Sequence, residues 1–363
     1  MTSKPIMGDG PFSGPLPEDV RALVLSLTDE RVPPQGVVKA SKLALAIAEG
    51  LGPLLGSRIA AAKLLVPEEA RADLVWTHQM CMASNLVRTD AVDSLANVYA
   101  SCAIPIVLLK GMALIQSGLT AGERSMADVD ILVPPSRWRE ACDLAAGAGY
   151  EKEPSGRRPY TVENDYVRSF TSPGGVVVEI HRFVCEQSMF SVDYQGSDGL
   201  FARARGLRPG VFVPDSGDLF LTLAAHAAKH TFELPLRSYV DGLVLLRRDE
   251  LSMGALAARA KTWRMQNAFA AWVGSLNRFA VDGASVAEEH RVAKRVTRLV
   301  WGRTSHQPPW QRLIRMAWLM DSSADWAWHV ATRSLLRAVD AVQSPPWLPV
   351  SPTIPSPDGV EPP

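Results

Sequence analysis

The side chains in this sequence that most clearly suggest a chemical role are two aspartates separated by one residue. Asp128 and Asp130 stand in an apolar stretch whose other residues include Val129 and Ile131. Because side chains alternate between the two faces of a strand, the aspartates share one face while the apolar residues enter the core. Mg²⁺ accepts one or two carboxylates and completes its shell with water and substrate phosphates. The pattern fits a cation site, although a solvated strand end is the common alternative.

The neighbouring segments favour the cation site. Residues 107–111 read Val-Leu-Leu-Lys-Gly, which predicts a strand that enters a turn at Lys110 and Gly111, where backbone N–H groups can meet a phosphate. Residues 176–181 place a third acid, Glu179, in an apolar strand with His181 on the same face. Buried acids are costly without compensation. The ordered set therefore indicates a site for metal and phosphate.

Basic side chains that could reach such a site come from two further places. His226 and His230 are four residues apart on an expected helix and share a face, with Lys229 beside them. The Glu that a zinc peptidase carries between its two histidines is missing. The pair is therefore either hydrogen-bonded packing or part of a substrate site, with Lys229 reaching a phosphate. Arg124 either binds phosphate or anchors its loop to a carboxylate. Asp241 either orients the helix of the histidine pair or lines the cleft, and we expect the structural role.

The elements that must position these residues follow from periodicity and from breaker residues. Pro53 and Pro67 mark helix boundaries, Ser136 is an expected helix cap, and either Asp215 or Ser216 is expected to cap the helix that follows it. Strands mixed with crossing helices between residues 104 and 185 imply one α/β or α+β domain. Strands are expected at 104–109, 129–133, 167–172 and 176–183, and helices at 18–27, 68–100, 137–146, 216–230, 238–248, 252–263, 268–278 and 287–300.

These elements divide the chain into five parts. We expect a loose Pro/Gly-rich lead-in at 1–39, a helical segment at 40–103, an α/β core at 104–215, a helical domain at 216–343 and a Pro-rich disordered tail at 344–363.

Composition restricts the partners. The chain of 363 residues carries 38 Lys+Arg and 38 Asp+Glu, so its formal net charge is zero. Its overall charge therefore does not attract nucleic acid or an anionic membrane. No apolar run reaches the ~18 residues of a membrane span and the start has no signal-peptide core, so we expect a cytoplasmic protein that uses no membrane. A basic stripe at 291–298, made of Arg291, Lys294, Arg295 and Arg298, is a solvated face or an RNA contact.

Taken in order, these motifs resemble a known family. The segments 108–111, 128–133, 178–181 and 226–230, with Arg124 between the first two, are similar to the nucleotidyltransferase superfamily that shares the DNA polymerase β palm. Within it, the chain resembles bacterial proteins classed as uncharacterised nucleotidyltransferases, over roughly residues 70–280. The family's first motif has Gly followed by Gly or Ser, whereas here Gly111 precedes Met112. The resemblance implies an α+β fold with a polymerase β palm-like mixed sheet, flanked by helical N- and C-terminal segments.

The resemblance also implies an activity. Mg²⁺ (or Mn²⁺) and an NTP such as ATP would be used to transfer a nucleoside monophosphate to an acceptor hydroxyl, with release of pyrophosphate. The acceptor is a small molecule, a peptide or protein, or RNA. A non-catalytic nucleotide-binding scaffold and a toxin-like enzyme that modifies tRNA are the alternatives. The implied metal ligands and catalytic acids are Asp128, Asp130 and Glu179; the nucleotide-binding residues are Lys110, Gly111, Arg124 and Lys229; and the residues near the substrate are His181, His226 and His230.

Overall fold

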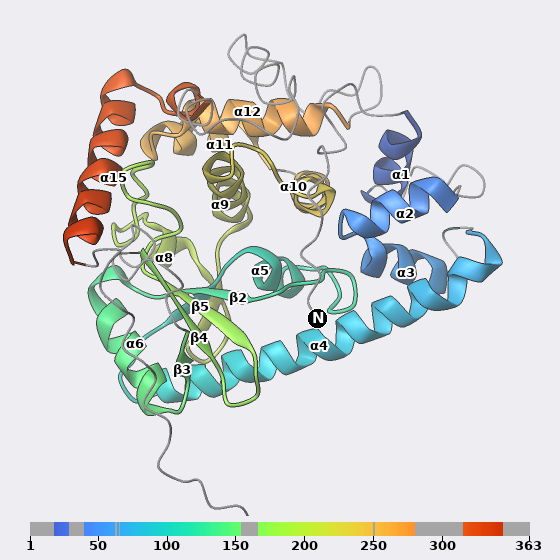
Figure 1. Ribbon diagram of the computed structural model, residues 1–363, viewed down its shortest axis with the longest axis horizontal. Coiled ribbons are helices and arrows are strands. Elements are labelled where there is room, and N and C mark those ends of the chain that lie inside the picture. Colours follow the sequence, from blue (N-terminus) through green and yellow to red (C-terminus); the bar gives the residue numbers. More distant parts are fainter. Residues whose placement is uncertain are drawn as a thin grey trace, which may run out of the picture.

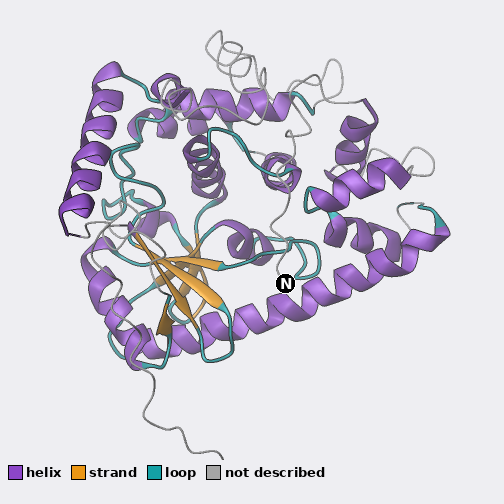
Figure 2. Cartoon of the chain, viewed as in Figure 1, coloured by secondary structure: helices purple, strands orange, loops and turns teal. Residues whose placement is uncertain are grey.

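The computed structural model describes residues 18–28, 40–61, 64, 66–153, 166–249, 251–279 and 315–343. At its centre the described residues form a mixed sheet in the order β3-β4-β5-β2-β1-β7-β6, with helices around it (Figures 1 and 2). The pairs β2–β5 and β1–β7 are parallel and the other pairs are antiparallel. The strands are β1 (Ile106–Leu108), β2 (Val129–Leu132), β3 (Glu151–Lys152), β4 (Val167–Thr171), β5 (Val177–His181), β6 (Arg205–Arg208) and β7 (Val211–Val213). The expected α+β class is confirmed.

Helices lie on both sides of this sheet. Figure 1 shows α9 to α12 gathered on one side, and α4 running along the other with α6 near its end. The helices are α1 (Glu18–Thr28), α2 (Ala40–Ala48), α3 (Gly52–Ala60), α4 (Glu68–Ala100), α5 (Lys110–Gln116), α6 (Trp138–Gly147), α8 (Leu200–Arg203), α9 (Ser216–Lys229), α10 (Leu236–Arg248), α11 (Met253–Thr262), α12 (Gln266–Asn277) and α15 (Ser323–Gln343). None of the helices in the described part of the chain is long and apolar enough to cross a membrane.

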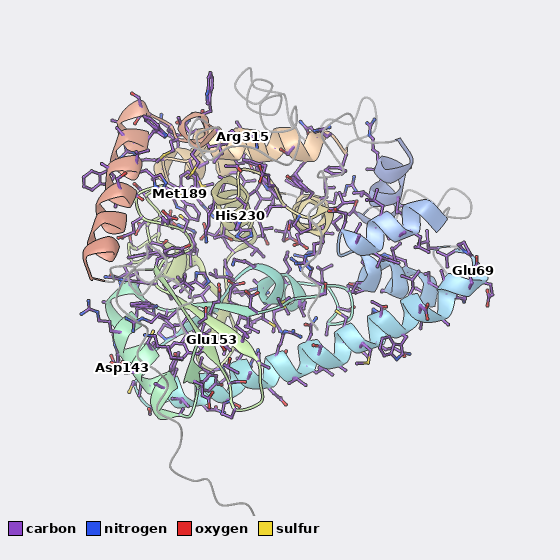
Figure 3. The ribbon with its side chains drawn as sticks, viewed as in Figure 1. Glu69, Asp143, Glu153, Met189, His230 and Arg315 are labelled. Carbon is purple, nitrogen blue, oxygen red and sulfur yellow. The ribbon has the colours of Figure 1, made fainter. Side chains whose placement is uncertain are left out.

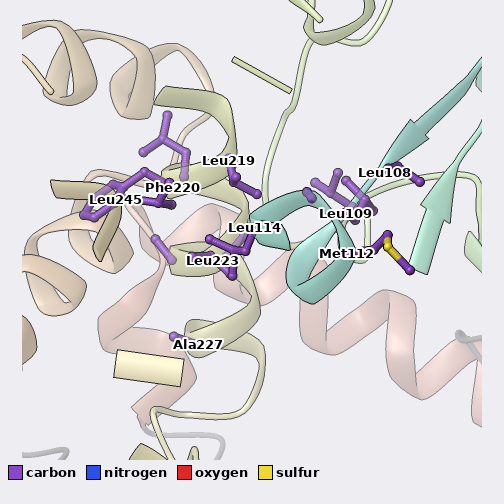
Figure 4. Close-up of a cluster of buried hydrophobic side chains, with 14 of the residues drawn as sticks. Leu108, Leu109, Met112, Leu114, Leu219, Phe220, Leu223, Ala227 and Leu245 are labelled. Atoms are coloured by element: carbon purple, nitrogen blue, oxygen red, sulfur yellow. The ribbon is translucent and has the colours of Figure 1, made fainter. Parts of the chain in front are cut away.

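Helix α5 lies between the sheet and α9, and it packs against both. The side chains of β1 are completely buried, and so are those of Val129 and Ile131 on β2. Leu114 of α5 packs among apolar side chains of α9, including Leu219 and Leu223 (Figure 4). Burial of such side chains contributes about 1.5–3 kcal/mol each. The short turn after β1 is therefore fixed from both the sheet and the helical side.

Proline or aspartate residues mark the starts of α3, α4 and α9. The predicted helix at 68–100 is confirmed as α4, which begins directly after Pro67, and Pro53 lies in the first turn of α3. Asp215 caps α9, as expected, because its carboxylate accepts a hydrogen bond from the N–H of Asp218. None of the four cysteines, all of which lie in the described residues, forms a disulfide.

One predicted cap is wrong. Ser136 does not cap α6; residues Pro135–Arg137 form a 3-10 turn, and α6 begins at Trp138 with no side-chain cap. The turn forms because the N–H of Arg137 donates to the carbonyl oxygen of Pro134, and the fixed φ of proline favours this geometry. The expected helix at 287–300, the basic stripe at 291–298 and the tail at 344–363 lie outside the described residues.

Gly56 lies where α3 packs closely against α4. A Cβ added there would lie 2.1 Å from the backbone oxygen of Leu74 and 2.8 Å from Cβ of His78. We expect Gly56→Ala to destabilise the protein by about 1–3 kcal/mol, because the overpacking exceeds the ~1 kcal/mol that Ala gains in a helix. Chemical denaturation measures the change. In the control Gly147→Ala, where the added Cβ meets nothing within 4 Å, stability is expected to stay equal or rise. Equal stability of both variants would contradict this close approach.

Candidate active site

The pairing of β2 with β5 brings two carboxylates together. The strands are parallel, and their register places Asp130 directly opposite Glu179. His181 lies on the same face of β5 as Glu179, because it is two residues further along. One ligand atom each of Asp130, Glu179 and His181 lies within 4.8 Å of the others. The strands therefore form a compact cluster of oxygen and nitrogen donors.

His181 lies between the two carboxylates of this cluster. Its Nε2 is 2.8 Å from Oδ1 of Asp130 and 3.3 Å from Oε2 of Glu179. Burial acts to lower the pKa of His181, but the hydrogen bonds with the two carboxylates raise it above its ordinary value. On the other side of the ring, Nδ1 lies 3.4 Å from the carbonyl oxygen of Phe183. The imidazole is thus held at both nitrogens.

Lys110 adds a cation to the cluster. It is the first residue of α5, with φ of +46°, and its ammonium Nζ lies 2.5 Å from Oδ1 of Asp130. Burial opposes its charge, yet the pKa of Lys110 is raised because Asp130, Glu179 and Asp128 surround it. A non-glycine residue at positive φ is uncommon and persists only where its surroundings enforce it. The turn after β1 therefore directs this lysine at the acids.

Gly111 has a packing role in this turn. It is buried, and a Cβ at its position would lie 2.6 Å from the Sδ of Met126. Met126 belongs to the segment that leads to Asp128. Gly111 thus allows the turn after β1 and the segment before β2 to approach closely.

Asp128 is a third acid near the cluster, whereas the donors that lie within 4.8 Å of one another belong to Asp130, Glu179 and His181. It comes directly before β2 and is half-buried. Burial raises its pKa, and so do the negative charges of Asp130 and Glu179, while Lys110 acts in the opposite direction. The pKa of Asp130 lies far below its usual range, since Lys110 and His181 outweigh its burial. Carboxylate oxygens grouped in this way are the donors that divalent cations use in proteins, so the residues fit such an ion.

Arg124 anchors its loop. Its Nε donates to Oδ1 of Asp241 at 2.9 Å, and its Nη2 lies 2.9 Å from Oδ2 of the same residue, on α10. The side chains of Arg124 and Asp241 are 13% and 3% exposed. Asn85 of α4 donates to the backbone oxygens of Ala121 and Arg124. The structure thus contains the anchoring pair that was one of the two alternatives for Arg124, and it gives Asp241 the expected structural role.

The end of α9 lies beside the carboxylates. The rings of His226 and His230 are 4.6 Å apart (His230 is labelled in Figure 3). Burial lowers the pKa of His226 well below its ordinary value, and Lys110 is the largest of the charges that add to this effect. Lys229 donates from Nζ to the hydroxyl of Tyr166 at 2.5 Å. The helix therefore presents a mainly neutral His226 and a cationic Lys229 to this region.

Sequence reasoning missed two residues of this region. Tyr166, which precedes β4, lies with its ring 6.3 Å from that of His181, and no pattern in the sequence distinguishes it. Arg237 on α10 donates to the hydroxyl of Ser125 at 3.3 Å. Burial lowers the pKa of Arg237, and Arg124 acts in the same direction. Its i, i+4 spacing from Asp241 is the signal that could have identified it.

Comparisons with known proteins place this geometry in context. Residues 40–279 match the model of a family described as "Uncharacterised nucleotidyltransferase". Among solved structures, the chain is similar to the solution structure of the antibiotic-resistance factor ANT(2'')-Ia, at 10% identity and a TM-score of 0.35. The likeness covers 49% of this chain and 91% of that chain. A search of the curated proteins gave no match.

Proposed function

Since the chain belongs to the family of uncharacterised nucleotidyltransferases, we propose that it transfers a nucleoside monophosphate from an NTP to an acceptor hydroxyl. The observation that carries the proposal is the placement of Asp130 on β2 opposite Glu179 on β5, with Asp128 directly before β2. Two buried or half-buried carboxylates side by side, with a third at the strand entrance, form an acidic group suited to cations and phosphates. A scaffold that only binds nucleotide would not need all three acids.

Asp128, Asp130 and Glu179 would hold Mg²⁺ or Mn²⁺. When bound, such an ion neutralises phosphate charge and aligns the groups for an in-line displacement. The acceptor oxygen forms a bond to the α-phosphorus, and the bond from this phosphorus to the bridging oxygen breaks, so that pyrophosphate leaves. Glu179, whose side chain is 26% exposed, takes the proton of the acceptor hydroxyl on a carboxylate oxygen. Lys110 and Lys229 bind phosphate charge, with Gly111 shaping the turn and His181, His226 and His230 adjoining the substrate.

The acceptor belongs to one of three chemical classes: a small molecule, a peptide or protein side chain, or an RNA end. An RNA acceptor would involve the basic stripe at 291–298, and its binding would weaken steeply with salt. A small-molecule acceptor would show little salt dependence. The chain's zero net charge gives no general attraction to RNA, which favours a non-RNA acceptor.

Calorimetric titration of each NTP, with and without Mg²⁺, tests the proposal directly. We expect metal-dependent binding of at least one NTP to the wild type, and a large loss of this binding in Asp128→Asn. Metal-independent binding of equal strength in both proteins would contradict the proposed site. The preferred base identified in this way then serves to screen hydroxyl acceptors for pyrophosphate release.

Glu179→Gln separates the proton-accepting role from binding. We expect turnover to fall by about 10²–10⁴-fold, the usual contribution of a general base, with NTP affinity within about threefold of wild type. Steady-state turnover and calorimetry give the two values. Glu151→Gln, on the exposed strand β3, is the matched control and is expected to keep full turnover. Full turnover in Glu179→Gln would assign the proton to another group.

A further inference from the structure

The side chain of His181 is placed where a metal ligand would lie. Its side chain is only 4% exposed, and its Nε2 points to the two carboxylates at 2.8 and 3.3 Å. Ligand atoms that share one ion at about 2.0–2.2 Å lie within roughly 4.4 Å of one another. Both distances fall inside this limit. The imidazole nitrogen therefore occupies the same small volume as the carboxylate oxygens.

The other ring nitrogen supports the same role. Nδ1 faces the carbonyl oxygen of Phe183 at 3.4 Å, and a carbonyl can only accept, so a proton on Nδ1 satisfies this contact. When an ion replaces the proton that Nε2 shares with Asp130 and Glu179, a neutral ring protonated at Nδ1 directs the lone pair of Nε2 at the ion. Metal-binding histidines in proteins commonly donate their second N–H to a backbone carbonyl, which fixes the tautomer and the ring orientation.

We propose that Nε2 of His181 is itself a metal ligand beside the carboxylates of Asp130 and Glu179, and that this imidazole makes the site select a first-row transition ion such as Mn²⁺ over Mg²⁺. The inference rests on the proposed function and refines it. Mg²⁺ is held by oxygen donors, whereas imidazole suits transition ions. A carboxylate has about four lone-pair sites, so Asp130 retains capacity for an ion beside its contacts with Lys110 and His181.

Electron paramagnetic resonance of the full chain with Mn²⁺ alone tests this ligand without relying on turnover. We expect the wild type to bind Mn²⁺ and to show electron spin echo modulation from one coordinated ¹⁴N. In His181→Gln the nitrogen modulation is expected to vanish, the Kd for Mn²⁺ to rise about 10–100-fold, and the preference for Mn²⁺ over Mg²⁺ in competition to fall. His226→Gln, which changes a neighbouring histidine on α9, is the matched control and is expected to keep the modulation.

If His181→Gln does not fold, labelling the double variant His226→Gln, His230→Gln with [¹⁵N]histidine keeps the test decisive, because this variant lacks the other histidines beside the site. The ¹⁴N modulation must then be replaced by that of ¹⁵N. Oxygen-only coordination of Mn²⁺ in the wild type, or modulation that persists in folded His181→Gln, overturns the assignment. If NTP turnover is present in that case, the proposed function stands and only the ligand assignment fails. If the wild type neither binds Mn²⁺ nor turns over any NTP, both proposals fail.

Discussion

Asp128→Asn is expected to lower turnover by about 10²–10⁴-fold, while the protein stays as stable as the wild type or becomes slightly more stable. Loss of a carboxylate that holds the metal removes several kcal/mol of transition-state stabilisation, at 1.36 kcal/mol per tenfold change in rate. The stability follows from the surroundings of Asp128. Burial and the charges of Asp130 and Glu179 raise its pKa, so its negative charge is unfavourable in the folded protein. A neutral amide removes this repulsion.

Turnover and thermal unfolding are measured on the same preparation. Asp143→Asn, on the exposed part of α6, is the control, and it is expected to change neither quantity. Full turnover in Asp128→Asn would remove this residue from the metal ligands and leave Asp130 and Glu179 as the acids of the site. A large fall in melting temperature would instead give Asp128 a structural role.

Asp241→Asn is expected to reduce the free energy of unfolding by about 3–5 kcal/mol. The Asp241 carboxylate pairs with Arg124 through two short contacts, and both side chains are nearly enclosed. Removing one partner of a buried ion pair leaves the other charge desolvated without compensation. The pair also joins the loop before β2 to α10, so the loss acts on two parts of the fold. Urea unfolding measures the change.

Two further variants separate the buried pair from an ordinary ion pair. Replacing both partners, as Arg124→Met with Asp241→Leu, is expected to recover much of the stability, because no charge then remains buried. Glu140→Gln removes the partner of Arg137 in a pair whose side chains are 37% and 44% exposed, and is expected to change the free energy of unfolding far less than Asp241→Asn does. A cost in Asp241→Asn as small as that in Glu140→Gln would contradict the buried pair.

Local signals in the sequence were sufficient for the helices and strands near the site. Periodicity and a preceding proline identify α4 with its observed limits, and Asp215 identifies the start of α9. The cap at Ser136 could not be predicted correctly, because two prolines before it favour a 3-10 turn that the spacing of polar residues does not reveal. Local rules succeed where a single residue determines the boundary.

Long-range contacts decide what the sequence could not predict. The acids were identified from their places in apolar strands, but the parallel pairing of β2 with β5 depends on residues far apart in the chain. For the same reason, the ion pair of Arg124 with Asp241 on α10 could not be predicted from the sequence. Tyr166 and its contact with Lys229 carried no local signal at all.

The register of β2 against β5 ties the assembly of the site to folding. A slip of one residue would send every side chain of a strand to the opposite face. It would therefore separate Asp130 from Glu179 and expose the apolar residues that alternate with the acid on the slipped strand. The backbone hydrogen bonds that protect these two strands from solvent exchange are therefore the same bonds that hold the acids in place. Amide protection in β2 and β5 reports how many molecules carry an assembled site, and opening of this strand pair dismantles it.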